Sequence, residues 1–235
     1  PSGAGKSLCF QLPPLCAPDG RWALVISPLV ALMQDQVSTL RQRQIRAGLC
    51  GSGARGDAAA SWAAMRVGAF KIVYMCPEFA LRHLAELAEL RSAICLLAVD
   101  EAHCVSSWGQ DFRPSYLRLA SLREALPGVP TMCVTATCTP RVRADIERFL
   151  ALRPGFASVV GTMNRPNLKF VVRERTSYFE DLGELFGACG VAGGRAEVEA
   201  RSALHVENDA PGPTSSAIVY VARQKDCERL AAWLA

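Results

Sequence analysis

The sequence has no C-x-x-C pair, although it contains ten cysteines. Several of the scattered cysteines, such as Cys9, Cys95 and Cys133, stand inside apolar runs, where a free buried thiol is the usual state. This spacing argues against a disulfide framework and against a zinc site within the chain. The sequence also lacks a signal peptide, a charged presequence and any apolar run of membrane length, so we expect a soluble intracellular protein.

A strong imbalance of charge is also absent. The net charge is +4 over 235 residues, which permits a local basic surface but does not by itself indicate a nucleic-acid partner. The chain is 50% hydrophobic and 20% charged, a composition typical of globular proteins. Its length allows one or two domains and a large core.

An apolar strand followed by two carboxylates is the central feature. Ile94–Val99 is an unbroken apolar run of strand length, and Asp100, Glu101 and His103 come directly after it. Such a run suits a parallel strand that helices cover on both faces. Carboxylates at the end of a buried strand cost free energy unless a cation or hydrogen-bond donors satisfy them. Mg²⁺ with a bound nucleotide would do so. Taken alone, however, the pair could also be a surface turn.

The chain begins with part of a phosphate-binding pattern. Residues 1–7 read P-S-G-A-G-K-S, the later part of G-x-x-x-x-G-K-[ST]. The first glycine of the pattern would lie before Pro1, so we expect the chain to be a piece of a longer protein. Gly3 and Gly5 permit a nest of backbone N–H groups, Lys6 supplies a point charge for the terminal phosphates, and the Ser7 hydroxyl suits Mg²⁺. The expected loop comprises Ser2, Gly3, Ala4, Gly5, Lys6 and Ser7.

That pattern also has a plainer interpretation, a glycine-rich turn that precedes a lysine by chance. The carboxylate strand downstream favours the nucleotide site. We expect a helix to begin at the loop and to end at Pro13 and Pro14.

Strand and helix patterns alternate along the first part of the chain, which predicts right-handed crossovers and a parallel sheet. The expected strands are Arg21–Ile26, Lys71–Met75, Ile94–Val99 and Thr131–Val134, and the expected helices are Leu29–Leu40, Ala58–Val67, Phe79–Leu90, Leu117–Leu126 and Pro140–Leu150. Phe156–Val160 and Leu168–Arg173 are further β-type runs. Because ligands bind at the carboxyl ends of such strands, we expect Ser7, Ser27, Glu78 and Asp100 at one edge of the sheet.

Composition changes near the C-terminal end. Glycine, proline and alanine punctuate residues 188–216, which predicts a flexible insertion. A strand at Ala217–Val221 and a helix at Gln224–Leu234 then follow. We therefore divide the chain into a first domain (1–173), a connector (174–216) and the start of a second domain (217–235).

The segment after the carboxylates combines aromatic and basic side chains. Trp108 and Phe112 could stack bases at about 1–3 kcal/mol per base, and Arg113 could hold a phosphate. The alternative is that the two aromatic rings are simply packed under a loop, and it applies most to Phe112.

These motifs together resemble the RecQ family of superfamily 2 DNA helicases. The resemblance covers nearly the whole chain, and its motifs occur in the family's order: Pro1–Pro13, Ser27–Val37, Tyr74–Glu78, the D-E-A-H box Asp100–His103, the aromatic-rich loop Cys104–Tyr116, the T-A-T motif Thr135–Thr137, Asn164–Leu168 and Ile218–Leu234. It implies an α/β fold, a RecA-like P-loop NTPase domain with helices on both faces of a parallel sheet, followed by the first βα unit of a second RecA-like lobe.

The resemblance also implies ATP hydrolysis that drives 3′ to 5′ movement along DNA and unwinding, in DNA repair and recombination. In this interpretation Lys6, Asp100, Glu101 and His103 are catalytic, and Ser7 and Asp100 bind Mg²⁺. Trp108, Phe112, Arg113, Thr135 and Thr137 would bind DNA or couple it to hydrolysis. Arg165 and Asn167 could contact DNA or only cap a turn.

Two other functions stay open. A non-catalytic nucleic-acid-binding relative would keep the fold, and an RNA helicase of the wider D-E-A-H group would keep the ATP site. The expected partners are ATP and single-stranded and duplex DNA, without a membrane. The expected location is the nucleus in a eukaryote and the cytoplasm or nucleoid otherwise. Residues 1–235 alone are not expected to unwind DNA. Finally, a His103–Cys104 catalytic dyad is rejected because no third group would orient it.

Overall fold

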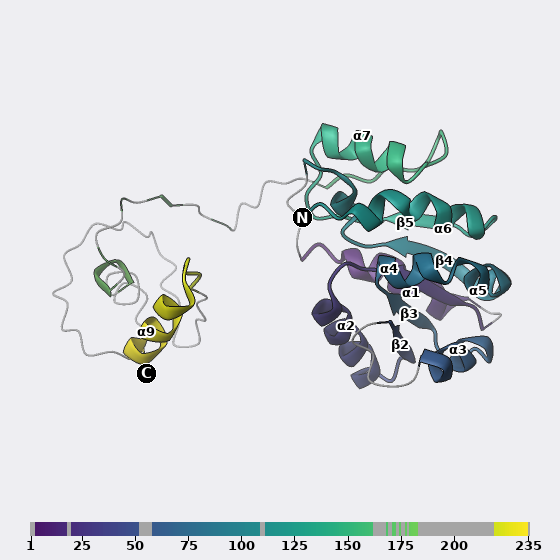
Figure 1. Cartoon of the computed structure of the whole chain (residues 1–235), viewed down its shortest axis with the longest axis horizontal. Helices are drawn as coiled ribbons and strands as arrows, with labels where there is room; N and C mark the ends of the chain where they lie inside the picture. The colour runs from purple at the N-terminus through teal and green to yellow at the C-terminus, as the bar shows by residue number, and fades with distance from the viewer. Residues whose placement is uncertain are drawn as a thin grey trace. The chain divides into compact units, whose positions relative to one another are not determined.

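The computed structural model describes residues 3–17, 20–51, 58–108 and 111–161, together with 168, 171–172, 174, 177, 179–182 and 219–234. The chain divides into two compact units, Pro1–Arg165 and Pro166–Ala235 (Figure 1). Most of the predicted connector 174–216 lies outside the described residues, as do Ser2, Arg165 and Asn167.

A five-stranded sheet forms the centre of the first unit, with the order β2-β3-β1-β4-β5. All its strand pairs are parallel, which confirms the predicted fold class. Parallel neighbours need crossover connections, and helices supply them here. The strands are β1 (Trp22–Ile26), β2 (Ala47–Cys50), β3 (Ile72–Met75), β4 (Ile94–Val99) and β5 (Thr131–Cys133).

Helices pack around this sheet (Figure 1). They are α1 (Lys6–Cys16), α2 (Val30–Gln42), α3 (Ala58–Arg66), α4 (Pro77–Arg82), α5 (Leu84–Glu89), α6 (Leu119–Ala125) and α7 (Pro140–Phe149), with short 3₁₀ helices η1 (Arg91–Ala93), η2 (Ala102–Val105) and η3 (Pro114–Arg118). Helix α1 contacts β1 and β4, α2 contacts β2 and β3, and α6 contacts α4 and α5. Among the described residues no helix is long and apolar enough to cross a bilayer.

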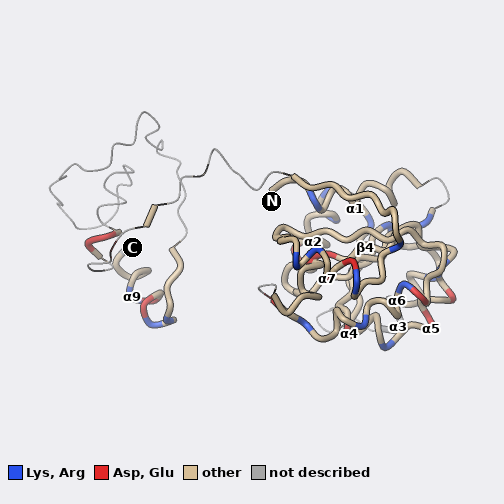
Figure 2. The backbone as a smooth tube through the Cα atoms, turned by 90° about the horizontal axis from the view of Figure 1, so that it is seen from above, with Lys and Arg blue, Asp and Glu red and all other residues tan. Residues whose placement is uncertain are grey.

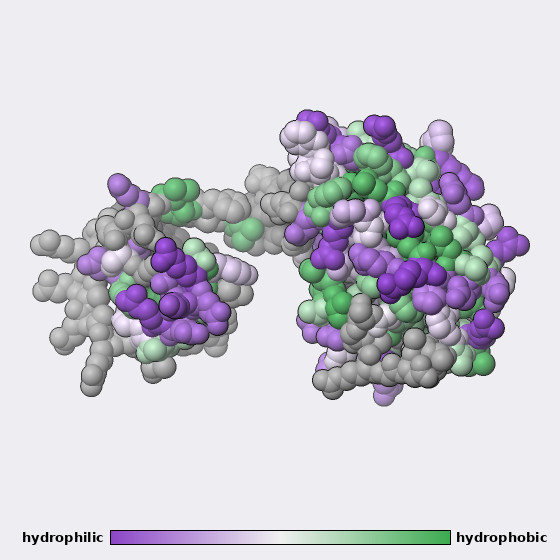
Figure 3. Space-filling view, in the orientation of Figure 1, coloured by the Kyte–Doolittle hydropathy of each residue, from purple (hydrophilic) through white to green (hydrophobic). Residues whose placement is uncertain are grey.

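The apolar runs of the sequence form the core. Every residue of β1 is buried, and β4 is buried except for the half-buried Cys95. Phe10 of α1 and Leu97 of β4 belong to the same buried cluster. Full burial of side chains of this size stabilises the fold by roughly 1.5–3 kcal/mol each. On the visible surface, hydrophobic and hydrophilic side chains are mixed (Figure 3), and acidic and basic positions are interspersed along the backbone (Figure 2).

Three features of the first unit differ from the sequence-based expectations. Helix α1 continues through Pro13 and Pro14 to Cys16, so the two prolines, each of which lacks an N–H donor, weaken its last turns without ending it. Strand β2 was not predicted. Phe156–Val160 is not a strand, and its valines are largely exposed without strand partners in the described part of the chain.

Within the second unit, the predicted helix is confirmed as α9 (Gln224–Leu234). Leu230 on this helix is buried, and Trp233 meets Phe179 with ring centroids 5.5 Å apart. Residues 219–221 of the predicted strand Ala217–Val221 are not in a strand, and the other two residues lie outside the described part.

Candidate functional site

The carboxyl ends of the central strands bring the predicted site residues together. The parallel register aligns Ile26 with Val99, and Val99 with Cys133. The residues that follow these strand ends therefore share one edge of the sheet, and they include Ser27, Asp100 and Thr135. The backbone confirms this proximity, because the Asp100 N–H donates to the carbonyl of Ile26 at 2.8 Å.

The phosphate-binding loop has the backbone that its glycines predict. Gly3 and Gly5 have φ of 75° and 79°, a left-handed conformation that side chains with a Cβ rarely adopt. Gly5 caps α1, so Lys6 and Ser7 stand in the first helical turn beside its free N–H groups. A helix start of this kind favours phosphate. Ala4 is exposed in the loop.

Lys6 belongs to the same site as the two acidic residues. Its positive charge partly offsets the burial that raises the pKa of Asp100, and it adds to the effect of His103 in lowering the pKa of Glu101. Helix α1 also packs against β4, the strand that ends at Asp100. The structure therefore brings the loop lysine and the acidic pair, nearly a hundred residues apart in sequence, to one side of the sheet.

Asp100 is held tightly at the end of β4. The residue is 9% exposed, and its Oδ1 accepts a hydrogen bond from the Glu101 N–H at 2.9 Å. Burial, followed by the negative charge of Glu101, raises the pKa of Asp100 to about 6. A nearby cation would reverse this shift, because it favours the charged carboxylate.

Glu101 adopts an unusual backbone conformation, with φ 47° and ψ 46°. A non-glycine residue in this left-handed region is strained by about 1–3 kcal/mol, and such strain concentrates at functional sites. The conformation turns the chain sharply between β4 and η2. It places the carboxylate beside His103, with Oε2 3.2 Å from His103 Nδ1.

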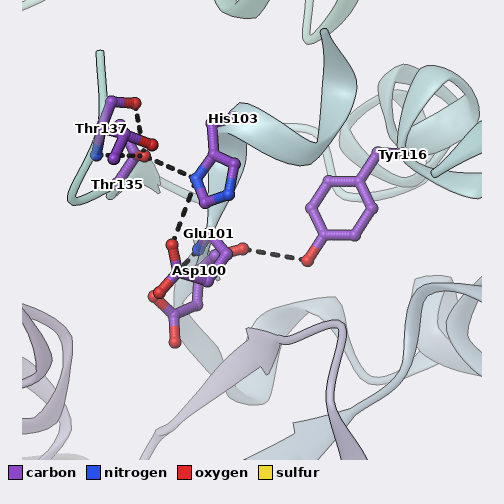
Figure 4. A network of polar contacts seen from close by, with 6 residues as sticks. All are labelled: Asp100, Glu101, His103, Tyr116, Thr135 and Thr137. Atoms are coloured by element: carbon purple, nitrogen blue, oxygen red, sulfur yellow. Dashed lines mark hydrogen bonds and ion pairs between the residues drawn. The ribbon is translucent and has the colours of Figure 1, made fainter. Parts of the chain in front are cut away.

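His103 bridges the acidic pair and the T-A-T turn (Figure 4). Its Nδ1 lies 2.8 Å from Thr135 Oγ1. The Thr135 hydroxyl donates to the Thr137 carbonyl at 2.9 Å, so its oxygen is an acceptor toward His103 and toward the Thr137 N–H. This pattern assigns the imidazole proton to Nδ1. Interaction with His103 is the largest influence on Glu101 and lowers the pKa of its carboxyl.

Glu101 Oε2 keeps capacity to accept a proton. The atom is buried, and its contact with His103 is within ion-pair distance but lacks the geometry of a hydrogen bond. A buried carboxylate oxygen in this state can accept a hydrogen bond from a water molecule. The lowered pKa keeps Glu101 ionised, so its carboxylate has the chemistry of a proton acceptor.

The donor set fits Mg²⁺ held with a nucleotide. Mg²⁺ keeps several waters and is commonly bound by one or two carboxylates plus phosphate oxygens, not by an all-protein cage. The Asp100 carboxylate and the Ser7 hydroxyl match that chemistry. No cluster of three or more His, Cys, Asp or Glu that could hold a metal occurs within the described residues.

The aromatic-rich loop connects to this edge through Tyr116. This tyrosine is fully buried in η3, and its hydroxyl donates to the main-chain carbonyl of Asp100 at 2.9 Å (Figure 4). Burial raises the pKa of Tyr116, so the hydroxyl keeps its proton. The loop that begins after the D-E-A-H box therefore returns to Asp100, the first residue of that box. Sequence reasoning missed this role, for which Tyr116 itself carried no local signal.

The three residues of the aromatic-rich loop that were predicted to bind DNA or couple it to hydrolysis differ in their surroundings. Trp108 is 62% exposed and Phe112 is 42% exposed, so neither ring is packed under the loop. The Arg113 guanidinium donates to the Pro28 carbonyl at 2.7 Å, which ties the loop to the turn after β1. In this conformation Arg113 fixes the loop. Residues 109–110 lie outside the described part.

Two further findings bear on side chains near the site. Cys104 is buried, which raises the pKa of its thiol to about 11 and keeps it from acting as a thiolate nucleophile. Gln11 was missed by sequence reasoning: it is buried in α1, and its Nε2 donates to Gln36 Oε1 at 2.9 Å and to the Tyr74 hydroxyl at 3.3 Å. It thereby links the helix after the phosphate loop to α2 and β3.

Comparison with known proteins agrees with this geometry. Residues 1–146 match the model of the DEAD/DEAH box helicase family. The chain is 41% identical over 177 residues to the mouse bifunctional 3′-5′ exonuclease/ATP-dependent helicase WRN, covering 74% of this chain and 12% of that protein. It is 37% identical over 182 residues to the ATP-dependent DNA helicase RecQ of Haemophilus influenzae, covering 77% of this chain and 29% of that protein.

Another relative matches almost the entire chain. The ATP-dependent DNA helicase Q-like 2 of Arabidopsis thaliana is 36% identical over 98% of this chain and 31% of its own length. The chain thus spans less than a third of the curated relatives named here. Among solved structures, the DUF1998 helicase MrfA bound to DNA and AMPPNP superposes with a TM-score of 0.50 at 23% identity, over 64% of this chain and 23% of that chain, which supports the helicase-domain fold. This chain belongs to the DEAD/DEAH box helicase family, and its relatives are helicases of the RecQ type.

Proposed function

We propose that the protein containing this chain is an ATP-dependent DNA helicase that couples ATP hydrolysis to 3′ to 5′ translocation and duplex unwinding. The observation that carries the proposal is the His103 bridge. One imidazole nitrogen contacts both the Glu101 carboxylate and the Thr135 hydroxyl, so it joins a candidate general base to the turn beside the aromatic-rich loop.

In this proposal each residue has a role that its surroundings support. Lys6 and the first-turn N–H groups of α1 would bind the phosphates of ATP. Glu101 would accept a proton from the attacking water, and its lowered pKa keeps it ionised. Ser7 and Asp100 would hold Mg²⁺, which would neutralise phosphate charge when bound. Most of the rate in P-loop enzymes comes from such positioning and charge stabilisation.

DNA binding is proposed for the exposed loop side chains Trp108 and Phe112. Stacking on such rings is tolerant of base sequence, as a translocating helicase needs. Arg113 would act by holding the loop on Pro28, in line with its contact. Unwinding is assigned to the full-length protein and not to residues 1–235, and the proposed setting is DNA repair and recombination, in the nucleus if the source is eukaryotic.

The experiment is ATP hydrolysis by the full-length protein with single-stranded DNA, with RNA, and without nucleic acid. Lys6→Ala should abolish hydrolysis because it removes the phosphate-binding charge. Lys71→Ala is the matched control, because Lys71 stands at the opposite, amino end of β3.

Normal turnover by Lys6→Ala would remove the P-loop assignment. Stimulation by RNA alone would favour the RNA helicase, and a full-length protein without any hydrolysis would favour the non-catalytic relative.

A further inference from the structure

Arg141 of α7 lies over the ring of Trp108. Its guanidinium carbon is 3.5 Å from the ring centroid, a close cation–π contact. Trp108 is nevertheless 62% exposed, so the contact leaves much of the ring open. We propose that Arg141 positions the Trp108 indole as a stacking platform for a base of single-stranded DNA, covering one face and presenting the other. The inference rests on the proposed function and adds to it a residue that the loop motif does not contain.

The backbone of Trp108 is held by the same face of α7. The Trp108 N–H donates to Ser106 Oγ at 3.2 Å, and the Ser106 hydroxyl donates to Asp145 Oδ2 at 2.6 Å. Ser106 is fully buried. Arg141 and Asp145 are four residues apart and therefore neighbours on one helix face. One face of α7 thus fixes both the backbone and the ring of Trp108.

The position of Arg141 in its helix points toward an anionic ligand. It stands in the first turn of α7, where the helix dipole favours negative charge, and this turn contains no acidic residue. A cation here does not serve helix stability. Together with the positive end of the helix dipole it makes a positive region beside the open ring, which suits the phosphate that accompanies a stacked base.

The other arginines of α7 contact residues of the helix itself, whereas Arg141 contacts Trp108 of the loop. Arg143 pairs with Glu147 at 2.7 Å on the same helix, and Arg148 lies 5.2 Å from the centroid of the adjacent Phe149 ring. Neither contact reaches the loop. This makes Arg148 a matched control, because it carries the same charge on the same helix about 10 Å further along the axis.

Helix α7, which holds Trp108, also follows directly on the T-A-T turn of the proposed ATP site. Helix α7 begins at Pro140, and its cap is Thr139, two residues after Thr137. The preceding turn holds the Thr135 hydroxyl that contacts His103. A base on Trp108 would therefore act on an element that is covalently joined to the turn beside Glu101.

The test is binding of a fluorescein-labelled oligo(dT) by the full-length protein, measured by anisotropy across a series of salt concentrations. Arg141→Ala should weaken binding about three- to tenfold and reduce the salt slope by about 1. Arg141→Lys should restore the slope and part of the affinity, because it keeps the charge. Arg148→Ala should leave the affinity near that of the unmodified protein. Quenching of tryptophan fluorescence by oligo(dT) should fall in Arg141→Ala, which a merely structural role would not produce alongside normal ATP binding.

Trp108→Ala distinguishes a failure of the Arg141 role from a failure of the proposed function. If Trp108→Ala weakens binding while Arg141→Ala matches the unmodified protein in affinity and slope, the role of Arg141 is wrong and the proposed function stands. Tighter binding by Arg141→Ala would also overturn the inference, because it would make Arg141 a shield over the ring. If Trp108→Ala binds DNA and responds to it normally, the DNA-sensing part of the proposed function fails as well.

Discussion

Asp100 and Glu101 are adjacent carboxylates whose pKa values shift in opposite directions. Burial raises the pKa of Asp100 to about 6, whereas interaction with His103 lowers that of Glu101. Both shifts follow from where the backbone places each side chain. Asp100 is enclosed at the strand end, and the left-handed turn at Glu101 swings the next carboxylate toward His103. Environment thus separates the pKa values of two adjacent acidic residues.

Because the pKa of Asp100 is raised, we predict that replacing this aspartate by a neutral residue stabilises the fold by an amount that depends on pH. An aspartate with a folded-state pKa above its ordinary value destabilises the fold at high pH, and this cost fades as pH falls through about 6 toward 4. Without Mg²⁺ and nucleotide, Asp100→Asn should therefore raise the free energy of unfolding at pH 8 by about 1–3 kcal/mol. The gain should shrink markedly at pH 4.5.

Urea unfolding of both proteins at the two pH values measures this difference. Comparison at equal pH cancels the contribution of groups that do not interact with Asp100. An equal gain at both pH values, or a loss of stability at pH 8, would show that Asp100 is not destabilised by burial.

Helix α7 is the element that joins the T-A-T turn to the aromatic-rich loop. It begins with Thr139, whose Oγ1 accepts a hydrogen bond from the Val142 N–H at 3.3 Å, and Pro140 occupies the first helical position. Val142 and Ile146 bury its apolar side. A threonine cap and proline start are favourable at this end of a helix.

Removal of this cap should destabilise the protein. Thr139→Ala loses the side-chain acceptor for the Val142 N–H and should lower the free energy of unfolding by about 1 kcal/mol. Thr139→Ser is the matched control, since it keeps the hydroxyl, and it should stay close to the unmodified protein. Urea denaturation measures both. If the two variants were equally stable, the cap would contribute nothing.

Elements with a strong local pattern were predictable from the sequence. The unbroken apolar run of β4 and the proline at the start of α7 each carry their signal within a few residues. Strand β2 does not: its short Ala-Gly-Leu-Cys segment is a strand because β3 pairs with it, and the Phe70 ring packs 3.0 Å from where a Cβ on Gly48 would lie. The apolar run Phe156–Val160 has a β-type composition but no strand partner among the described residues.

The residues of the candidate site also fall into those that a local sequence pattern predicts and those that it does not. Gly5, Lys6 and Asp100 were identified because nucleotide chemistry requires those residue types in a local pattern. Tyr116 and Arg141 were not, because their roles depend on contacts with distant residues, the Asp100 carbonyl and the Trp108 ring. Such pairings are decided by the packing of whole elements, which no short motif encodes.

At the scale of the molecule, one edge of the parallel sheet gathers the phosphate loop, the acidic pair and the T-A-T turn. Parallel strands make this possible because all of their carboxyl ends point the same way. The aromatic-rich loop leaves this edge at Glu101 and returns to it through the Tyr116 hydroxyl. A movement of the loop would therefore be transmitted to the backbone of Asp100 through this hydrogen bond.

The most direct test of this account is Glu101→Gln in the full-length protein. It keeps the shape of the side chain but removes the carboxylate that would accept the proton from water. ATP binding, measured with a fluorescent nucleotide analogue, should stay within about threefold of the unmodified protein, while hydrolysis should fall by about 10²–10⁴-fold with or without single-stranded DNA. Hydrolysis by Glu101→Gln at the normal rate would contradict the assignment of Glu101 as the proton acceptor at this edge of the sheet.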